Sequence, residues 1–385
     1  MGGLGERSVT GENRESERAA RLRLSRLAEP GDRQLGQLVR KFGAPTVVDR
    51  IGARDTSVPG VDNYLTRWDE PVADLDGLAA IDGRFIIPGD SEWPTQLDAL
   101  DDTVPWGLFV RGCDLRLSVL RSVAIVGARA ATQYGLHVAS ELASDLADRR
   151  WTVVSGGAYG IDAAAHRGAL NCGGSTVAVL ACGVDVSYPK GNASLFERIP
   201  TQGGCLVAEL PPGTHPTKPR FLQRNRLIAG LTRATVVVEA ADRSGALNTA
   251  AFCRQLGRQL LAVPGPVTSA MSAGCHRLLR DDDPARLVTA ADEIVEEVGP
   301  IGSLAMLPMI VDSVRDGLDP TSLRVLEAVP SLVAGGLADI VRDAGVERRL
   351  VAGIILRLVA AGLVQQVGDD GFRLIHGAGD RPGSP

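Results

Sequence analysis

The sequence lacks every feature that would place the chain in a membrane or export it. It has no run of about 18 apolar residues, and residues 1–7 do not show the basic-then-apolar pattern of a secretory signal peptide. With 385 residues, 44% hydrophobic and 23% charged, the composition is that of a globular protein of roughly two to three domains. We therefore expect a soluble, cytoplasmic protein without a membrane partner.

Paired cysteines and catalytic motifs are also missing. The six cysteines are scattered without a C-x-x-C pair, and no histidine completes the spacing of a metal site, so buried free thiols in a reducing cytosol are expected. There is no Walker G-x-x-x-x-G-K-[ST] loop, no G-x-S-x-G elbow and no H-E-x-x-H pair. The five histidines stand apart from any evident nucleophile. These absences predict a protein that is not an enzyme and uses neither a metal nor a cofactor.

The chain has no excess of positive charge either. Its formal net charge is −5 at pH 7 and its pI is about 5.7, so the molecule as a whole does not attract polyanions. Any nucleic-acid site must therefore be a local basic patch.

From Ser122 onward, the sequence does contain a regular alternation of short apolar strands and amphipathic helices. Runs of β-branched and small apolar residues predict strands at 122–126, 151–155, 176–181, 205–209, 235–239 and 259–263. Repeated βα units with right-handed crossovers imply a parallel sheet that helices cover on both faces. The predicted fold is α/β, a doubly wound Rossmann-like sheet.

Other patterns flank this sheet and set the expected domains. Residues 1–16 are polar and aperiodic and predict a disordered leader, and residues 17–82 predict a small helical, SAM-like domain. Two short strands before Ser122 are expected on the edge of the main sheet, so the Rossmann-like domain spans 83–300. Residues 315–376 predict three helices and an Asp-Gly hairpin, the order of a winged helix. Residues 377–385 form an expected flexible tail.

The first strand ends in Gly127-Ala128-Arg129, at the edge where open α/β sheets bind ligands. A dinucleotide-binding turn would continue as G-x-G-x-x-G, with glycine in the place of Arg129. The fixed donors of a guanidinium suit a phosphate held by a side chain more than a nucleotide cradled by amides. We therefore expect Arg129 to bind phosphate, although Gly-x-Arg alone is more commonly a surface arginine after a strand.

Two further turns at this predicted edge are rich in glycine. Ser155-Gly156-Gly157 lies between a strand and a helix and offers backbone amides to an anion, and the alternative is a tight turn that needs glycine for its shape. Ser244-Gly245 can hold an anion in the same way, with Arg243 as a further contact. Alternatively, Ser244 or Asp242 simply caps the next helix.

Residues 215–226 are the most basic segment, with one lysine, three arginines and no acid. Phe221 lies among these cations, and a single strand needs this combination, charge for its backbone and a flat ring for a base. The alternative is a solvated helix start with Phe221 packed in the core. The candidate DNA-binding residues are Gly127, Arg129, Ser155, Gly156, Gly157, Lys218, Phe221, Arg224, Asn225, Arg226, Ser244 and Gly245.

Jointly, these motifs resemble the bacterial DNA-processing protein A family, DprA, also called Smf. The resemblance covers about residues 83–300 and runs through 123–129, 155–162, 183–189, 224–230, 238–240, 244–247 and 263–265. It implies a non-enzymatic protein that binds incoming single-stranded DNA, shields it and helps to load the RecA recombinase in natural transformation and recombination. It also implies a homodimer through the Rossmann-like domain, and contact with the strand through Arg129, 155–157, Lys218, Phe221 and 224–226.

The sequence departs from that family's pattern at three places. Leu222 stands where the family usually has proline, which leaves the pose of Phe221 open. Gly274-Cys275-His276 replaces the usual Gly-Thr-Asn. Asn248 takes a place that is often apolar, and the sequence alone gives no reason for it.

Two other functions stay open at this point. The predicted fold is also similar to the lysine-decarboxylase-like phosphoribohydrolases, enzymes that act on nucleotide-derived small molecules, but their Pro-Gly-Gly-x-Gly-Thr loop is not found in 239–249. The third helix of the predicted winged helix carries Arg348, Arg349 and Arg357, as a regulator that binds duplex DNA would. That helix is mostly apolar, which favours packing or protein contact.

Overall fold

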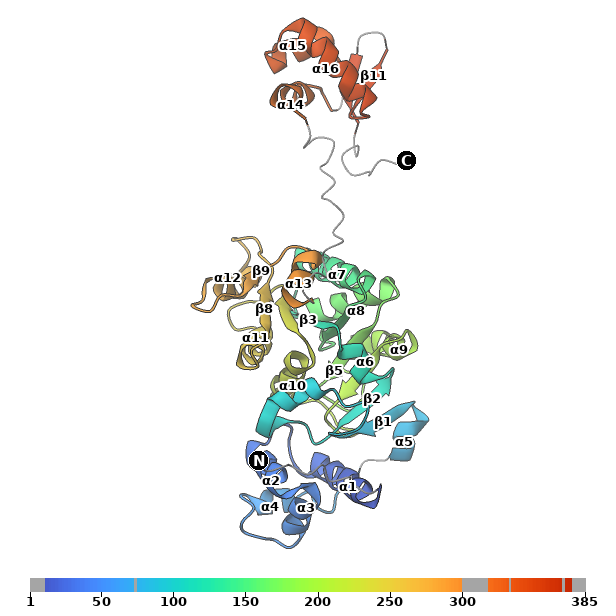
Figure 1. The fold of residues 1–385 in the computed structure, drawn as a ribbon, viewed down its shortest axis with the longest axis vertical. Helices are drawn as coiled ribbons and strands as arrows, with labels where there is room; N and C mark the ends of the chain where they lie inside the picture. Colours follow the sequence, from blue (N-terminus) through green and yellow to red (C-terminus); the bar gives the residue numbers. More distant parts are fainter. Residues whose placement is uncertain (1–10, 73–74, 300–317, 332–333, 369–370, 376–385) are drawn as a thin grey trace, which may run out of the picture. The chain divides into compact units, whose positions relative to one another are not determined.

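The computed structural model describes residues 11–72, 75–299, 318–331, 334–368 and 371–375 (Figure 1). The chain forms two compact units, Met1–Ser303 and Leu304–Pro385. Each unit has its own hydrophobic core.

The first unit is built on a mostly parallel sheet, as the alternating pattern predicted. Within the described residues its strand order is β1-β2-β6-β5-β4-β3-β7-β8-β9. The strands are β1 (Gly83–Ile86), β2 (Leu108–Gly112), β3 (Ser122–Val126), β4 (Thr152–Ser155), β5 (Thr176–Leu180), β6 (Cys205–Ala208), β7 (Ala234–Val237), β8 (Gln259–Ala262) and β9 (Arg286–Leu287). Strands β3 to β9 are parallel, whereas β2 joins β6, and β1 joins β2, in antiparallel fashion. The doubly wound α/β prediction and the two edge strands are therefore confirmed.

Helices cover both faces of this sheet (Figure 1). On one face, α10 (Lys218–Leu231), α11 (Ala246–Gln255) and α12 (Ala273–Arg280) pack against alternate strand residues that include Val126, Val179 and Val237. On the other, α8 (Ile161–Asn171) and α9 (Ala193–Thr201) pack against the residues of opposite parity, such as Ala178 and Leu206. Helix α7 (Gln133–Asp148) packs on α8, and α13 (Ala291–Val298) packs on α7. None of the helices in the described ranges is long and apolar enough to cross a membrane.

The six cysteines are free thiols. Cys182, Cys205, Cys253 and Cys275 are buried, whereas Cys113 is half-buried and Cys172 is exposed. Burial raises the pKa of Cys182 and of Cys275 to about 11. These two thiols are therefore protonated and poorly nucleophilic at neutral pH.

The N-terminal helices share a core with each other and with the start of the sheet domain. They are α1 (Gly11–Leu27), α2 (Arg33–Phe42), α3 (Ala44–Gly52), α4 (Val61–Leu65) and α5 (Leu75–Ala80). The apolar cluster of α1 to α4 contains Leu24, Leu35 and Ile51 and also takes in Trp106, which precedes β2. Helix α5 instead buries Leu78 in the core of the sheet domain. The predicted helical character of this region is therefore observed.

The expectation of a disordered leader is wrong for residues 11–16. Helix α1 already begins at Gly11, and residues 1–10 lie outside the described ranges. Arg14 and Arg18 bind the carboxylate of Asp90 at 2.6 and 2.8 Å. Contacts to a residue distant in sequence hold this first turn, so no local periodicity could reveal it.

The second unit contains helices α14 (Pro320–Glu327), α15 (Leu337–Ala344) and α16 (Arg348–Ala360). It also contains strands β10 (Gly335–Gly336), β11 (Val364–Val367) and β12 (Gly371–Leu374), which pair in the order β10-β12-β11. This is the element order of the predicted winged helix. Helix α16 buries Val351, Ile354, Ile355 and Leu358, as expected of a packing helix. The predicted tail, 377–385, lies outside the described residues.

Candidate nucleic-acid interface

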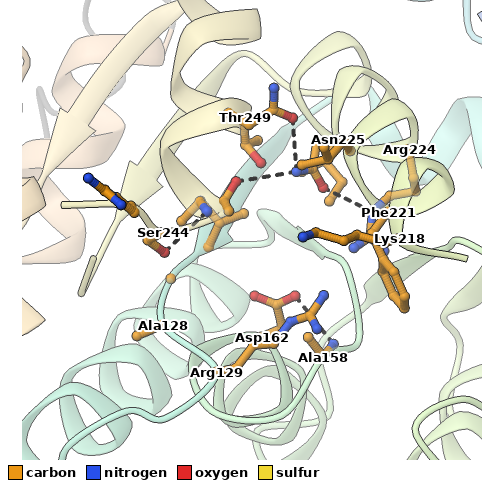
Figure 2. Close-up of a pocket in the computed structure, with 18 of the residues that line it drawn as sticks. Ala128, Arg129, Ala158, Asp162, Lys218, Phe221, Arg224, Asn225, Ser244 and Thr249 are labelled. Carbon is orange, nitrogen blue, oxygen red and sulfur yellow. Dashed lines mark hydrogen bonds between the residues drawn. The ribbon is translucent and has the colours of Figure 1, made fainter. Parts of the chain in front are cut away.

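A cavity of about 840 Å³ opens beyond the carboxyl ends of the parallel strands (Figure 2). The turns after β3, β4 and β7 and the first turns of α10 line it. Strand β3 lies between β4 and β7, and the chain runs to β4 on one side and returns to β7 on the other, which makes this the topological switch point of the sheet. Eight of the residues that the sequence indicated line the cavity: Gly127, Arg129, Lys218, Phe221, Arg224, Asn225, Ser244 and Gly245.

Two cations of this set are exposed at the cavity. Arg129 follows β3 and Lys218 is the first residue of α10, and the Lys218 amine extends into the cavity (Figure 2). Arg243, in the turn before α11, adds a third. Among the residues that the structure describes, none of the three has a carboxylate within salt-bridge distance. Their charges are therefore available to an anionic ligand.

The N-terminus of α10 faces the same cavity. Pro216 and Thr217, which precede the helix, line the cavity together with Lys218. Thr217 makes no side-chain capping bond, so the first amides of this 14-residue helix are not capped by a side chain. The partial positive charge of a helix N-terminus adds to the attraction for an anion.

Phe221 lines the cavity and is half-buried, so it is not a core residue. The guanidinium carbon of Arg129 lies 4.7 Å from the centre of its ring. The ring of Tyr188 also packs against Phe221, with 5.7 Å between the ring centroids and an angle of 49° between the ring planes. This answers the question of pose that Leu222 raised, because the ring stands at the cavity beside a free cation. Tyr188 was not among the predicted site residues.

The glycine loop after β4 is framework and does not present an open anion seat. Ser155 is fully buried and its hydroxyl donates to the carbonyl of Ile125 at 2.6 Å. A Cβ on Gly156 would lie 2.5 Å from the Arg224 guanidinium, and Gly157 has a φ of +69°. Glycine is therefore needed here for backbone shape, the alternative that the sequence left open. Ser155, Gly156 and Gly157 do not line the cavity.

At the N-terminus of α8, where the sequence predicted a bound anion, the carboxyl group of Asp162 is present instead. Asp162, in the first turn of α8, lines the cavity, and its carboxylate accepts the amide of Ala158 at 3.3 Å. The amide of Ile161, at the start of α8, is also occupied, because it donates to the carbonyl of Ala128 at 3.2 Å. Burial raises the pKa of Asp162, and the nearby Arg224 guanidinium opposes that rise. A carboxyl group thus faces the cavity where hydrogen-bond donors to an anion were expected.

Arg224 clamps the glycine loop. It is 6% exposed and donates to the carbonyl of Gly156 at 2.7 Å and to that of Val179. Burial lowers its pKa to about 10, and the charge of Asp162 acts against that change. Most of its donors are used inside the protein, so only part of this residue is available at the cavity.

Arg226 is a correction to the predicted set. It is 1% exposed, and Glu209 binds it with both carboxylate oxygens at 2.6 and 2.8 Å. Arg226 comes two residues after Arg224 on α10, and residues two apart on a helix point in different directions. Lys218, Phe221 and Asn225, in contrast, share one face. This helical spacing was the signal in the sequence that separates Arg226 from the cavity.

Asn225 joins α10 to the turn before α11. Its side-chain amide donates to the carbonyl of Gly245 at 3.3 Å and to the Asn248 side-chain oxygen at 3.2 Å. Asn248 therefore replaces an apolar residue in order to hold this turn. The Ser244 hydroxyl accepts the amide of Ala246 at 3.3 Å, but the N-cap residue of α11 is Gly245 and the helix has no side-chain capping bond.

Glu239 positions Arg129 and was not predicted to do so. It is 1% exposed, and its carboxylate accepts the amide and the hydroxyl of Thr132 at 2.9 and 2.5 Å. Its carbonyl accepts the amide of Ala128 at 2.7 Å. These bonds hold both ends of the turn that carries Arg129. An acid directly after a buried strand was the available signal.

Residues 84–299 match the family model of DNA recombination-mediator protein A. The chain belongs to this family. It is 46% identical over 357 residues to the putative DNA processing protein DprA of Mycobacterium tuberculosis (strain H37Rv), which covers 89% of this chain and 90% of that one. The family resemblance seen in the motifs is confirmed.

Other members are similar over a smaller part of the chain. The protein Smf of Escherichia coli is 42% identical over 218 residues, covering 56% of this chain and 57% of its own. The X-ray structure of DNA processing protein A from Streptococcus pneumoniae matches with a TM-score of 0.61 at 32% identity, covering 74% of this chain and 98% of that one. The arrangement of the sheet is therefore shared with a solved member of the family.

Proposed function

We propose that this member of the DNA recombination-mediator protein A family binds single-stranded DNA in the cavity, with phosphates on Arg129 and Lys218 and one base on Phe221. One observation carries the proposal. In a chain of net charge −5, three cations without a described salt-bridge partner surround one hollow that also presents an aromatic ring. Charge for the backbone and a ring for an unstacked base are what single-strand sites combine.

The same features favour a single strand over a duplex. In a duplex the faces of the bases are covered by their stacked neighbours, so only an unpaired strand offers a base face to Phe221. Among the described lining residues, Asp162 is the only acid and there is no histidine or cysteine. This lining supports binding more than bond cleavage.

We further propose that bound DNA is protected and passed to the RecA recombinase during natural transformation and recombination, and that the chain works as a homodimer through its Rossmann-like domain. The description of the family as a recombination mediator and the naming of its relatives as DNA processing proteins support this role. Cytoplasmic action on DNA that has already entered the cell follows from it.

Fluorescence anisotropy of the full chain tests the binding proposal. A labelled thymidine 20-mer is compared with a duplex of equal length over a range of salt concentrations. We expect preference for the single strand, and a log-log salt slope of about −0.7 per phosphate neutralised. Equal or tighter binding of the duplex would contradict the proposal. Release of free base from nucleoside monophosphates would instead support the phosphoribohydrolase alternative.

Phe221→Leu is expected to weaken binding of the thymidine 20-mer about fivefold or more, because stacking on an aromatic ring contributes roughly 1–3 kcal/mol per base. The salt slope stays the same, since no phosphate contact is removed. Phe221→Tyr keeps the ring and serves as the control. Unchanged affinity of the leucine variant would mean that the ring only supports Arg129.

Asp162→Asn is expected to tighten binding about threefold to tenfold at pH 7.5, because it removes a negative charge that repels phosphate across the cavity. Burial raises the pKa of Asp162, and a bound phosphate raises it further, so binding takes up a proton and strengthens as pH falls. The variant should therefore show a smaller change of Kd between pH 7.5 and pH 5.

Comparing the two proteins at each pH cancels the pH effects of all titratable groups that the two proteins share. Loss of affinity in Asp162→Asn would show that this carboxylate works by holding Arg224 and the amide of Ala158. Thermal melts establish that both proteins are folded at each pH.

A further inference from the structure

Two exposed tyrosines lie close to one loop beside the cavity, one at the cavity itself and the other outside its lining. Tyr188 is 45% exposed and lines the cavity beside Phe221. Tyr159 is 50% exposed, and its hydroxyl accepts the amide of Gly191 at 3.2 Å. The loop 188–192 therefore connects them, because one ring lies at its start and the other is bonded to its middle.

The composition makes this placement notable. Aromatic residues are 4% of the chain, and it has four tyrosines and three lysines. A large ring left in solvent gives up the burial that usually stabilises it. Lys190, in the loop between Tyr188 and the Gly191 amide that Tyr159 accepts, is exposed, and no carboxylate among the described residues lies within salt-bridge distance of it. Aromatic rings and an unpaired cation thus alternate along one path that begins at the cavity.

The path is held rigidly. Asn192 is 1% exposed, and its side-chain amide donates to the carbonyls of Gly157 and Ala158 at 3.0 and 3.3 Å. A Cβ on Gly191 would lie 2.6 Å from the Tyr159 hydroxyl oxygen, so the ring lies directly against the loop backbone. Rings that are already fixed lose little conformational entropy when a base stacks on them.

We propose that the single-strand site continues from Tyr188, at the cavity, to Lys190 and Tyr159, which lie beyond its lining. A nucleotide next to the one on Phe221 stacks its base on Tyr188, the following base stacks on Tyr159, and Lys190 neutralises a phosphate between them. The 5.7 Å separation of the Phe221 and Tyr188 rings lets consecutive nucleotides reach both. This inference rests on the proposed function, since it adds nucleotides to the same bound strand.

The test compares strand lengths with the full chain. Tyr159 lies outside the cavity lining, so Tyr159→Ala is expected to weaken binding of a thymidine 12-mer about fivefold or more and to leave binding of a dinucleotide unchanged. Tyr159→Phe keeps the ring and binds like the parent. The matched control is Tyr134→Ala, which removes a tyrosine that is 40% exposed on α7 and is expected to change neither affinity. Lys190→Gln is expected to make the log-log salt slope for the 12-mer less negative by about 0.7.

Two further measurements separate the possible outcomes. A second 12-mer carries bases at only one dinucleotide and abasic sites elsewhere. The parent should bind this strand more weakly than the full thymidine 12-mer, by the same factor by which Tyr159→Ala weakens binding of the full 12-mer. Photocrosslinking of the unmodified protein to a bromodeoxyuridine 12-mer should label the peptides that contain Tyr159 and Tyr188, which needs no variant to fold. Unchanged 12-mer affinity in Tyr159→Ala and Tyr188→Ala, with no crosslink at either ring, would overturn the inference and leave these rings to a protein contact.

The failure of this inference can be told from failure of the proposed function. If the parent binds the 12-mer and Lys218→Glu weakens that binding while the tyrosine variants do not, only the extension is wrong. If the parent binds neither the 12-mer nor the dinucleotide, the single-strand site itself is wrong.

Discussion

Glu209→Gln is expected to lower the free energy of unfolding by about 3–5 kcal/mol, because breaking one partner of a buried ion pair leaves the other charge without compensation. Glu209 is 6% exposed and Arg226 is 1% exposed. The glutamine would leave the Arg226 guanidinium buried, with its remaining bonds to carbonyls such as that of Thr103 at 3.1 Å. Urea unfolding followed by tryptophan fluorescence measures the loss, since all four tryptophans belong to the first unit.

A surface pair in the same unit provides the matched control. Arg111 binds Glu197 at 2.9 Å, but the Glu197 side chain is 61% exposed, so Glu197→Gln should cost less than about 1 kcal/mol. Replacing both buried partners, as in Glu209→Leu with Arg226→Met, should recover most of the lost stability. If Glu209→Gln is as mild as the surface control, the Arg226 charge reaches solvent and Arg226 is again a candidate to contact DNA.

Lys218→Glu is expected to weaken binding of single-stranded DNA about 10-fold to 100-fold for every base composition, because a charge-assisted hydrogen bond contributes roughly 1.5–3 kcal/mol. The log-log salt slope should become less negative by about 0.7, the value for one phosphate contact on a single strand. Lys218 stands at the uncapped start of α10 with its amine in the cavity (Figure 2). Anisotropy titrations at several salt concentrations give both quantities.

Lys41→Glu makes the same change of net charge elsewhere. Lys41 is exposed at the end of α2 and does not line the cavity, so its substitution should leave the salt slope unchanged and the affinity nearly so. An equal loss in both variants would point to a diffuse effect of net charge. Unchanged binding by Lys218→Glu would remove this lysine from the site.

Much of the fold followed from local patterns. Each predicted strand of the parallel sheet is present, from β3 to β8, because a buried parallel strand is a short apolar run that depends only on its own residues. The ligand edge could be named in advance for a similar reason, since parallel strands place their following turns at one end of the sheet. The first turn of α1 was missed because Asp90, not its own sequence, holds it.

Several of the predicted residues line the cavity, and others lie in the interior. Lys218, Phe221 and Asn225 share a helix face and line the cavity, and this could be read from their spacing. Tyr188 was missed because it meets Phe221 only through folding, from a loop between other elements.

The sequence by itself determined the order of strands and helices, the edge of the sheet where a ligand would lie, and the concentration of positive charge in one segment. These are properties of residues near one another in the chain. Only the tertiary structure decided which arginines face solvent, because that depends on distant carboxylates. Glu209 draws Arg226 into the interior, Asp162 and the carbonyl of Gly156 do the same for Arg224, and Arg129 is left with an aromatic ring as its neighbour.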